Sequence, residues 1–204
     1  MDVLDKYKKA WDNQPEDSQK VSKDDIYKMA HSRSSSIVKW IFIIGLLEFV
    51  IFQCSYFFYD TEKGYEMYKK MNLENFYIVT QIIGYAILLF FLLKFYKNYK
   101  SISTIDNTKN LMSKIIKTRK TVKHYVFFNL SYLFLVLTVV TVAMTNNEIE
   151  EIPEEKKIYI IIGLIVFGLI LILLFWLFYQ LLYGILLRKL NKNYKELAKL
   201  NELN

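Results

Sequence analysis

Glu48 is the residue in this sequence best suited to chemistry, because it is an acidic side chain in the middle of a long apolar stretch, residues 37–59. An ionisable group inside a bilayer costs on the order of 3 kcal/mol, so we expect it to face protein or water rather than lipid. Gln53 follows five residues later, about 140° around a helix, and need not share that face. Gln81 and Asn129 lie in two other apolar stretches and could reach the same interior.

Two roles for this intramembrane polar group follow from its chemistry. A cluster of carboxyl and amide groups could relay protons or hold a cation, which would make the chain a small transporter, a channel or a subunit of one. Four spans are few for a lone transporter, so this role would require a homo-oligomer or a larger membrane complex. Alternatively, a protonated Glu48 donates a hydrogen bond to a neighbouring helix and holds the bundle together, and we favour this packing role.

The remaining reactive side chains are few and scattered. The chain has one cysteine, Cys54, and two histidines, His31 and His124, so we expect no disulfide within the chain and no metal site made of these ligands. It has no glycine-rich phosphate loop, no HExxH pair, no GxSxG turn and no CxxC pair. We therefore predict a non-enzymatic protein with no cofactor, in which both histidines lie at the membrane interface or cap helices.

Four long apolar stretches must position these groups. Each reaches or exceeds the roughly 20 residues that a helix needs to cross a bilayer. They are residues 37–59, 76–95, 125–144 and 158–187. The sequence therefore predicts an all-α membrane protein, with a four-transmembrane-helix bundle over residues 37–187 and amphipathic helical extensions in the cytoplasm.

The distribution of charge predicts the orientation of this bundle. Residues 96–124 carry 8 basic and 1 acidic side chains, residues 188–204 carry 5 and 2, and residues 1–36 carry 7 and 7. The other loops, residues 60–75 and 145–157, are more acidic than basic. Because Lys and Arg are retained in the cytoplasm, both termini and the central loop are predicted to be cytoplasmic. Attraction to anionic lipid, about 1 kcal/mol per basic residue, makes the bilayer rather than nucleic acid the expected partner of this charge.

The charged segments carry helical patterns of their own. Residues 101–122 fit an amphipathic helix lying along the inner membrane surface, or a long helix that extends from the second span and turns back into the third, and the pattern does not separate the two. The last stretch would be about 45 Å long as a helix, against roughly 30 Å of hydrocarbon. Gln180 and Gly184 near its end favour projection into the cytoplasm, where residues 188–204 continue as an amphipathic helix.

Residues 1–36 are predicted to be a cytoplasmic segment of two amphipathic helices, the second capped by Ser22. Apolar and aromatic side chains form one stripe on each helix, and exposed aromatic side chains are frequent binding hot spots. The predicted partner-binding residues are Leu4, Tyr7, Trp11, Ile26 and Tyr27. This pattern favours a membrane regulator or scaffold that binds a cytosolic or membrane protein, and packing of the segment against residues 190–204 is almost equally compatible with it.

The same region carries short motifs typical of a known group of proteins. They are Asp24-Asp25-Ile26-Tyr27-Lys28-Met29, the Ser34-Ser35-Ser36 run and Lys39-Trp40 at the first span. In these motifs the chain resembles a family of small bacterial four-span inner-membrane proteins, some of which are labelled carotene-cleaving oxygenases. Such oxygenases hold iron with four histidines, and this chain has two. The resemblance implies a bacterial inner-membrane location and an association with alternative sigma factors, hence an anti-sigma-like role, although the His and Cys zinc ligands of one anti-sigma class are missing.

Overall fold

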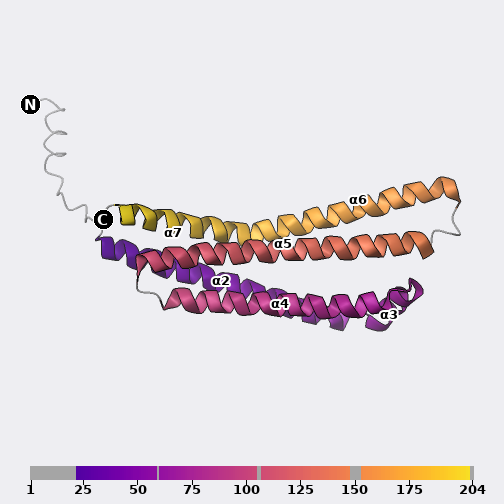
Figure 1. Ribbon diagram of the computed structural model, residues 1–204, viewed down its shortest axis with the longest axis horizontal. Coiled ribbons are helices and arrows are strands. Elements are labelled where there is room, and N and C mark those ends of the chain that lie inside the picture. Colours follow the sequence, from indigo (N-terminus) through magenta and orange to yellow (C-terminus); the bar gives the residue numbers. More distant parts are fainter. Residues whose placement is uncertain (1–21, 59, 105–106, 148–152, 203–204) are drawn as a thin grey trace, which may run out of the picture.

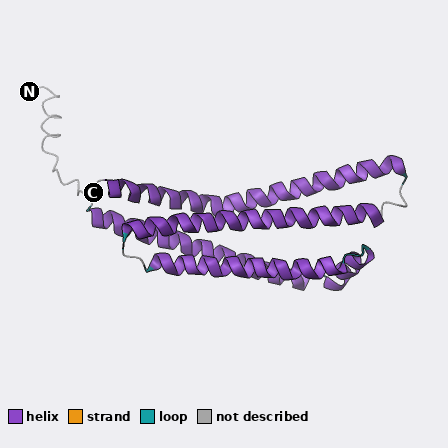
Figure 2. Ribbon diagram, in the orientation of Figure 1, coloured by secondary structure: helices purple, strands orange, loops and turns teal. Residues whose placement is uncertain are grey.

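The computed structural model describes residues 22–58, 60–104, 107–147 and 153–202. Within these ranges every regular element is a helix, joined by short connections, and no strand occurs (Figure 2). The helices are α2 Lys23–Phe58, α3 Thr61–Lys70, α4 Glu74–Ser103, α5 Thr108–Asn147, α6 Glu154–Tyr179, a π-helical turn η1 Gln180–Gly184, and α7 Ile185–Glu202. The prediction of an all-helical chain is confirmed for the described residues.

Four of these helical rods are long and apolar enough to cross a membrane, as the sequence predicted. They are α2, α4, α5 and the continuous rod formed by α6, η1 and α7. The rods run side by side, with α2 against α4 and α7, and α5 against α4, α6 and α7 (Figure 1). Both ends of the described chain lie at the same end of the bundle, and α3 lies at the opposite end against α4 (Figure 1).

The bundle is most tightly packed at the end that carries most of the basic residues. We call this end the stalk and define it as residues 22–39, 97–104, 107–123 and 188–202. Its core side chains come from all four rods and are almost completely shielded from solvent. They are Ala30, Val38, Ile102, Leu111, Ile115, Leu190 and Leu197. The apolar stripes that the sequence shows on these charged segments therefore face one another and exclude water.

The central charged segment forms the stalk parts of two long helices. α4 continues past its apolar stretch to Ser103, and α5 begins at Thr108, where the side chain of Asn107 accepts a hydrogen bond from the Lys109 backbone N–H at 2.9 Å. The alternative of a helix lying along the membrane surface is therefore wrong, and that of extended helices is confirmed. About 17 residues of α5 precede its apolar stretch, which makes the stalk roughly 25 Å long.

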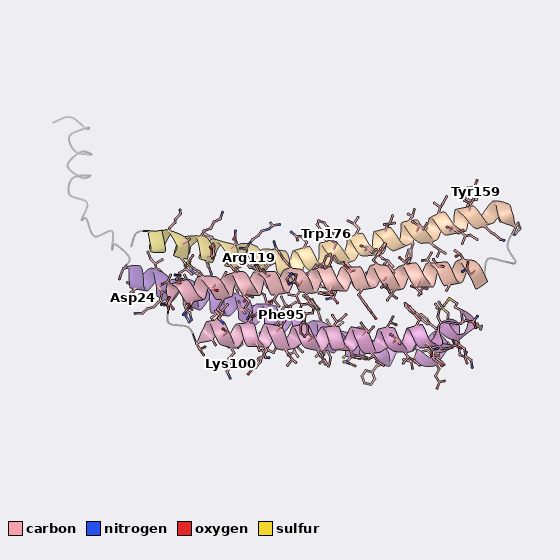
Figure 3. All side chains as sticks on the ribbon, in the orientation of Figure 1. Asp24, Phe95, Lys100, Arg119, Tyr159 and Trp176 are labelled. Carbon is pink, nitrogen blue, oxygen red and sulfur yellow. The ribbon has the colours of Figure 1, made fainter. Side chains whose placement is uncertain are left out.

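Packing loosens beyond the stalk. In the most apolar 18-residue segment of each rod, the share of residues buried inside the protein is 17% in α2, 6% in α4, and 0% in α5 and in the fourth rod. α6 also diverges from α5 toward the end where Tyr159 lies (Figures 1 and 3). The two hairpins, α2 with α4 and α5 with α6, thus share a core mainly at the stalk end.

Candidate functional site: Glu48 and the aromatic cluster

The carboxyl group of Glu48 links α2 to α5. The Tyr125 hydroxyl donates a hydrogen bond to Glu48 Oε2. Glu48 Oε1 and the Tyr183 hydroxyl are both buried without a hydrogen bond among the described residues. Tyr183 and Tyr179 nevertheless lie close enough to interact electrostatically with the carboxyl group, which makes the Tyr183 hydroxyl the nearest candidate donor to Oε1.

An aromatic cluster surrounds this contact on the stalk side. It consists of Phe91, Phe95, Tyr125, Tyr179 and Tyr183, whose neighbouring ring centroids are 5.3 to 6.4 Å apart. Offset and edge-to-face ring contacts at such distances each add about 0.5–1.5 kcal/mol beyond area burial. The π-helical turn begins just after Tyr179 and contains Tyr183, and the two rings stack with their planes 26° apart. The cluster therefore joins α4, α5 and the fourth rod around Glu48.

The neighbours of Glu48 also show how deep it lies. Its partner Tyr125 is the first residue of the third apolar stretch. A Cβ on Gly45, one turn before Glu48, would lie 2.9 Å from the ring of Phe95, the last residue of the second stretch. Glu48 is therefore level with the start of the third apolar stretch and close to the end of the second. Residues 37–44 of the first apolar stretch accordingly lie beside stalk and cluster residues.

On the other side of Glu48 is a cavity of about 470 Å³ between the two hairpins. Its wall is mostly aliphatic and aromatic, with Glu48, Asn129 and two tyrosines as its polar members. The lining residues are Glu48, Ile51, Phe52, Gly84, Ile87, Leu88, Asn129, Tyr132, Leu133, Phe175, Phe178 and Tyr179. The Asn129 amide donates to the Tyr125 carbonyl at 2.9 Å, one turn back along α5.

The structure brings together only part of the predicted intramembrane polar set. Glu48 and Asn129 line the same cavity, whereas Gln53 and Gln81 are not among its lining residues. Gln53 accepts a hydrogen bond from the Tyr85 hydroxyl at 3.4 Å, which is a contact between α2 and α4. Of the two amides suggested to reach the interior with Glu48, Asn129 lines its cavity and Gln81 does not, and tyrosines supply the other polar groups there.

This geometry defines what the site can do. Glu48 and Tyr179 line the cavity, and both also lie beside the aromatic cluster. The site is therefore a largely apolar cavity with one carboxyl group in its wall. Among the described residues, no three His, Cys, Asp or Glu side chains are grouped so that they could hold a metal ion. Cys54 is exposed.

The predicted partner-binding residues fall into two groups. Leu4, Tyr7 and Trp11 lie outside the described residues. Ile26 and Tyr27 lie in the first turns of α2, where both are partly buried. Tyr27 packs against the stalk core, and its ring stacks on His31 with centroids 6.0 Å apart. The expectation that Tyr27 is exposed is wrong, because its ring helps to cover the stalk core.

Two polar contacts fix the helices of the stalk to one another. His31 Nε2 lies 2.8 Å from the Ile102 carbonyl oxygen near the end of α4. Because a carbonyl only accepts hydrogen bonds, Nε2 is the nitrogen that carries the hydrogen. One turn later along α2, the Asn193 amide of α7 donates to the buried Ser34 hydroxyl at 3.1 Å. The expected capping role is confirmed for His31.

Comparison with known families adds one assignment. Residues 24–202 match the family model for a domain of unknown function, DUF8845. The chain belongs to the DUF8845 family. No curated protein and no solved structure matches the chain. The DUF8845 region contains the Glu48 site and the stalk from residue 24 onward, whereas Leu4, Tyr7 and Trp11 precede it.

Proposed function

We propose that this chain is a non-enzymatic membrane protein of four spans that acts as a regulator or scaffold, with its stalk in the cytoplasm as the platform for a protein partner. The four apolar rods are long enough to cross about 30 Å of hydrocarbon. Their most apolar windows bury few residues inside the protein, which suits side chains that face lipid. We assign the bacterial inner membrane as the location, on the resemblance noted in the sequence.

The observation that carries this proposal is the change in packing along the bundle. Lipid tails are as apolar as leucine, so helices in a bilayer gain little from excluding them. Helices in water gain about 25 cal/mol for each Å² of apolar surface that they bury. A sealed four-helix core in the stalk, with little burial beyond it, is the pattern expected of a bundle that passes from water into lipid.

The excess of Lys and Arg in the stalk supports its cytoplasmic location. Reporter fusions test this topology in the intact chain. Fusions after Asn72 and Glu150 should report the outer side, and fusions after Lys109 and Asn204 the cytoplasm. One reporter with the opposite signal would refute the proposed arrangement.

A partner is proposed to bind at the free end of the stalk, where α2 begins and residues 1–21 are attached. We expect Trp11→Ala to weaken co-purification of a partner with the full-length chain at least tenfold, as loss of a hot-spot aromatic does. Trp176→Ala is the matched control, because Trp176 is 47% exposed on α6, far from the stalk end. Tyr27→Ala would not be informative, since it removes packing from the stalk core. Equal recovery of the same proteins with both variants would count against a partner at Trp11.

The second candidate is a small transporter or a subunit of a larger membrane complex that uses Glu48. The cavity above Glu48 favours it, but flux would require the aromatic cluster to open. In proteoliposomes, Glu48→Gln should then abolish pH-dependent flux at unchanged thermal stability. A parent protein that carries no flux under any applied gradient would eliminate this candidate.

A further inference from the structure

A second cavity lies on the stalk, between α2 and α7. Its volume is about 490 Å³, and it differs from the cavity at Glu48 because five of its seven lining residues carry a charge or a hydroxyl group. The lining residues are Ser32, Arg33, Ser36, Ile37, Lys189, Lys192 and Asn193. We call it the basic groove.

The floor of the basic groove is held in place by a buried contact. Asn193 lines the groove with 5% of its surface exposed, and its amide donates to Ser34, which is completely buried, at 3.1 Å. This hydrogen bond joins α7 to α2 directly beneath the groove. The separation of the two helix backbones that carry the exposed groove side chains is therefore set by a buried contact.

The groove has an excess of positive charge. Arg33, Lys189 and Lys192 line it, and no carboxylate does. Within the described part of the chain, Arg33 has one acidic neighbour, Glu196, whose Oε2 lies 3.9 Å from Arg33 Nη1. This is a long contact between two partly exposed side chains. One carboxylate does not neutralise three cations. Together with two serine hydroxyls, these side chains offer many donors, which suits an anion with several oxygen atoms.

The position of the groove relative to the membrane narrows the choice of anion. Trp40 is 54% exposed on α2, and exposed tryptophans next to a span lie at the headgroup level. Ser36 and Ser32 come four and eight residues earlier, about 6 and 12 Å along the helix. The headgroup layer extends roughly 5–8 Å beyond the hydrocarbon. The groove thus opens at the depth of the lipid phosphates and just beyond them.

We propose that the basic groove binds the phosphate group of an anionic lipid in the cytoplasmic leaflet. Arg33, Lys189 and Lys192 neutralise the phosphate, and Ser32 and Ser36 donate hydrogen bonds to its oxygens. The acyl chains then extend past Ile37 along the apolar part of α2. This proposal rests on the membrane placement given above but not on a protein partner, so the purified chain alone is enough to test it.

Titration of the full-length protein in neutral detergent, followed by native mass spectrometry, tests the site. The probes are dioleoyl phosphatidylglycerol, dioleoyl phosphatidylcholine and inorganic phosphate. Phosphatidylglycerol should bind at least tenfold more tightly than phosphatidylcholine, because the zwitterionic headgroup carries its own cation. Inorganic phosphate that binds as tightly as phosphatidylglycerol would overturn the lipid assignment.

Two matched triple variants separate a built site from diffuse attraction. Arg33→Gln/Lys189→Gln/Lys192→Gln removes three charges from the groove, and Lys97→Gln/Lys109→Gln/Lys195→Gln removes three exposed charges elsewhere on the stalk. The groove variant should weaken phosphatidylglycerol binding at least tenfold, and the control less than threefold. Equal weakening by both variants would overturn the proposal.

A single substitution provides an independent check that does not rely on removing three side chains. Ser36 is exposed in the groove wall, so Ser36→Glu places a carboxylate beside the cations without disturbing the core. Phosphatidylglycerol binding should fall at least tenfold while the melting temperature stays within 2 °C, on the order expected for a surface substitution. Unchanged binding in this variant would contradict a phosphate site at this position.

Discussion

The hydrogen bond between Glu48 and Tyr125 can be measured by replacing the two residues singly and together. Glu48→Gln keeps an oxygen that accepts from the Tyr125 hydroxyl, whereas Glu48→Leu removes the acceptor. Tyr125→Phe removes the donor and keeps the ring in the aromatic cluster. Together these variants separate three contributions to stability, which are the shape of the side chain, the hydrogen bond and the ionisable group.

The structure sets the expected magnitudes. The Tyr125 side chain is only 3% exposed, so Glu48→Leu leaves its hydroxyl buried without a partner. That loss costs about 1–3 kcal/mol in proteins generally, and hydrogen bonds between transmembrane helices average about 0.6 with a maximum near 1.7 kcal/mol. We expect a loss of about 1–2 kcal/mol for each of Glu48→Leu and Tyr125→Phe. The double variant should lose about 1 kcal/mol less than the sum, because it leaves neither group unpaired.

Reversible unfolding in mixed micelles, followed by helical circular dichroism, is the assay. Glu48→Gln should lose less than about 0.5 kcal/mol, since the acceptor remains. Tyr159→Phe serves as control, because Tyr159 is 75% exposed at the other end of the bundle. If the losses from Glu48→Leu and Tyr125→Phe sum to within about 0.3 kcal/mol of the loss from the double variant, the two side chains are not coupled.

Three further predictions concern packing and capping. Gly45→Ala should destabilise the protein by about 1–3 kcal/mol in the same unfolding assay, because the added Cβ would lie 2.9 Å from the Phe95 ring. Gly163→Ala is the control and should be neutral or stabilising, because a Cβ at that position would have no neighbouring atom within 4 Å. Ile115→Ala in the sealed stalk core should cost about 2–5 kcal/mol, and Ile162→Ala at a 51% exposed position on α6 less than about 1. The backbone N–H of Lys63 and its ammonium group lower the pKa of Asp60. The stabilisation of α3 by this cap is therefore fully present above the unfolded-state pKa near 3.9 and is lost as the pH falls through the lower folded-state value. Asp60→Asn keeps the cap without a charge, so it should remove this pH dependence, as measured by NMR spectra of α3.

The four apolar rods could be predicted because their signal is local. Unbroken apolar runs of about 20 residues indicate the helices directly, and the stripes on the charged segments indicate that these continue as amphipathic helices. The cap at Ser22 was also predictable, and its hydroxyl accepts from the Asp24 backbone N–H at 3.3 Å. Short-range patterns of this kind require no knowledge of which helix contacts which.

The Glu48 site depends on the register between helices, which no local pattern contains. Tyr125 begins the third apolar stretch and Tyr183 lies near the end of the fourth, and only the alignment of α5 and η1 with α2 places them at Glu48. The four-residue spacing of Tyr179 and Tyr183 was the one available signal, since two hydroxyls on one side of an apolar helix need a polar partner. The π-helical turn that stacks their rings has no comparable sequence signal.

Packing connects the two sites along the bundle. α2 and α5 run unbroken from the stalk core to the cavity, so the position of Glu48 against Tyr125 depends on how these helices pack in the stalk. Lipid-facing segments gain little from pressing together, so the two hairpins are held mainly by the stalk core and the aromatic cluster, with a further contact from the Tyr132 hydroxyl to the Thr80 carbonyl. A ligand that changes the spacing of α2 and α7 at the basic groove would therefore act on the same helices that hold the Glu48 carboxyl group.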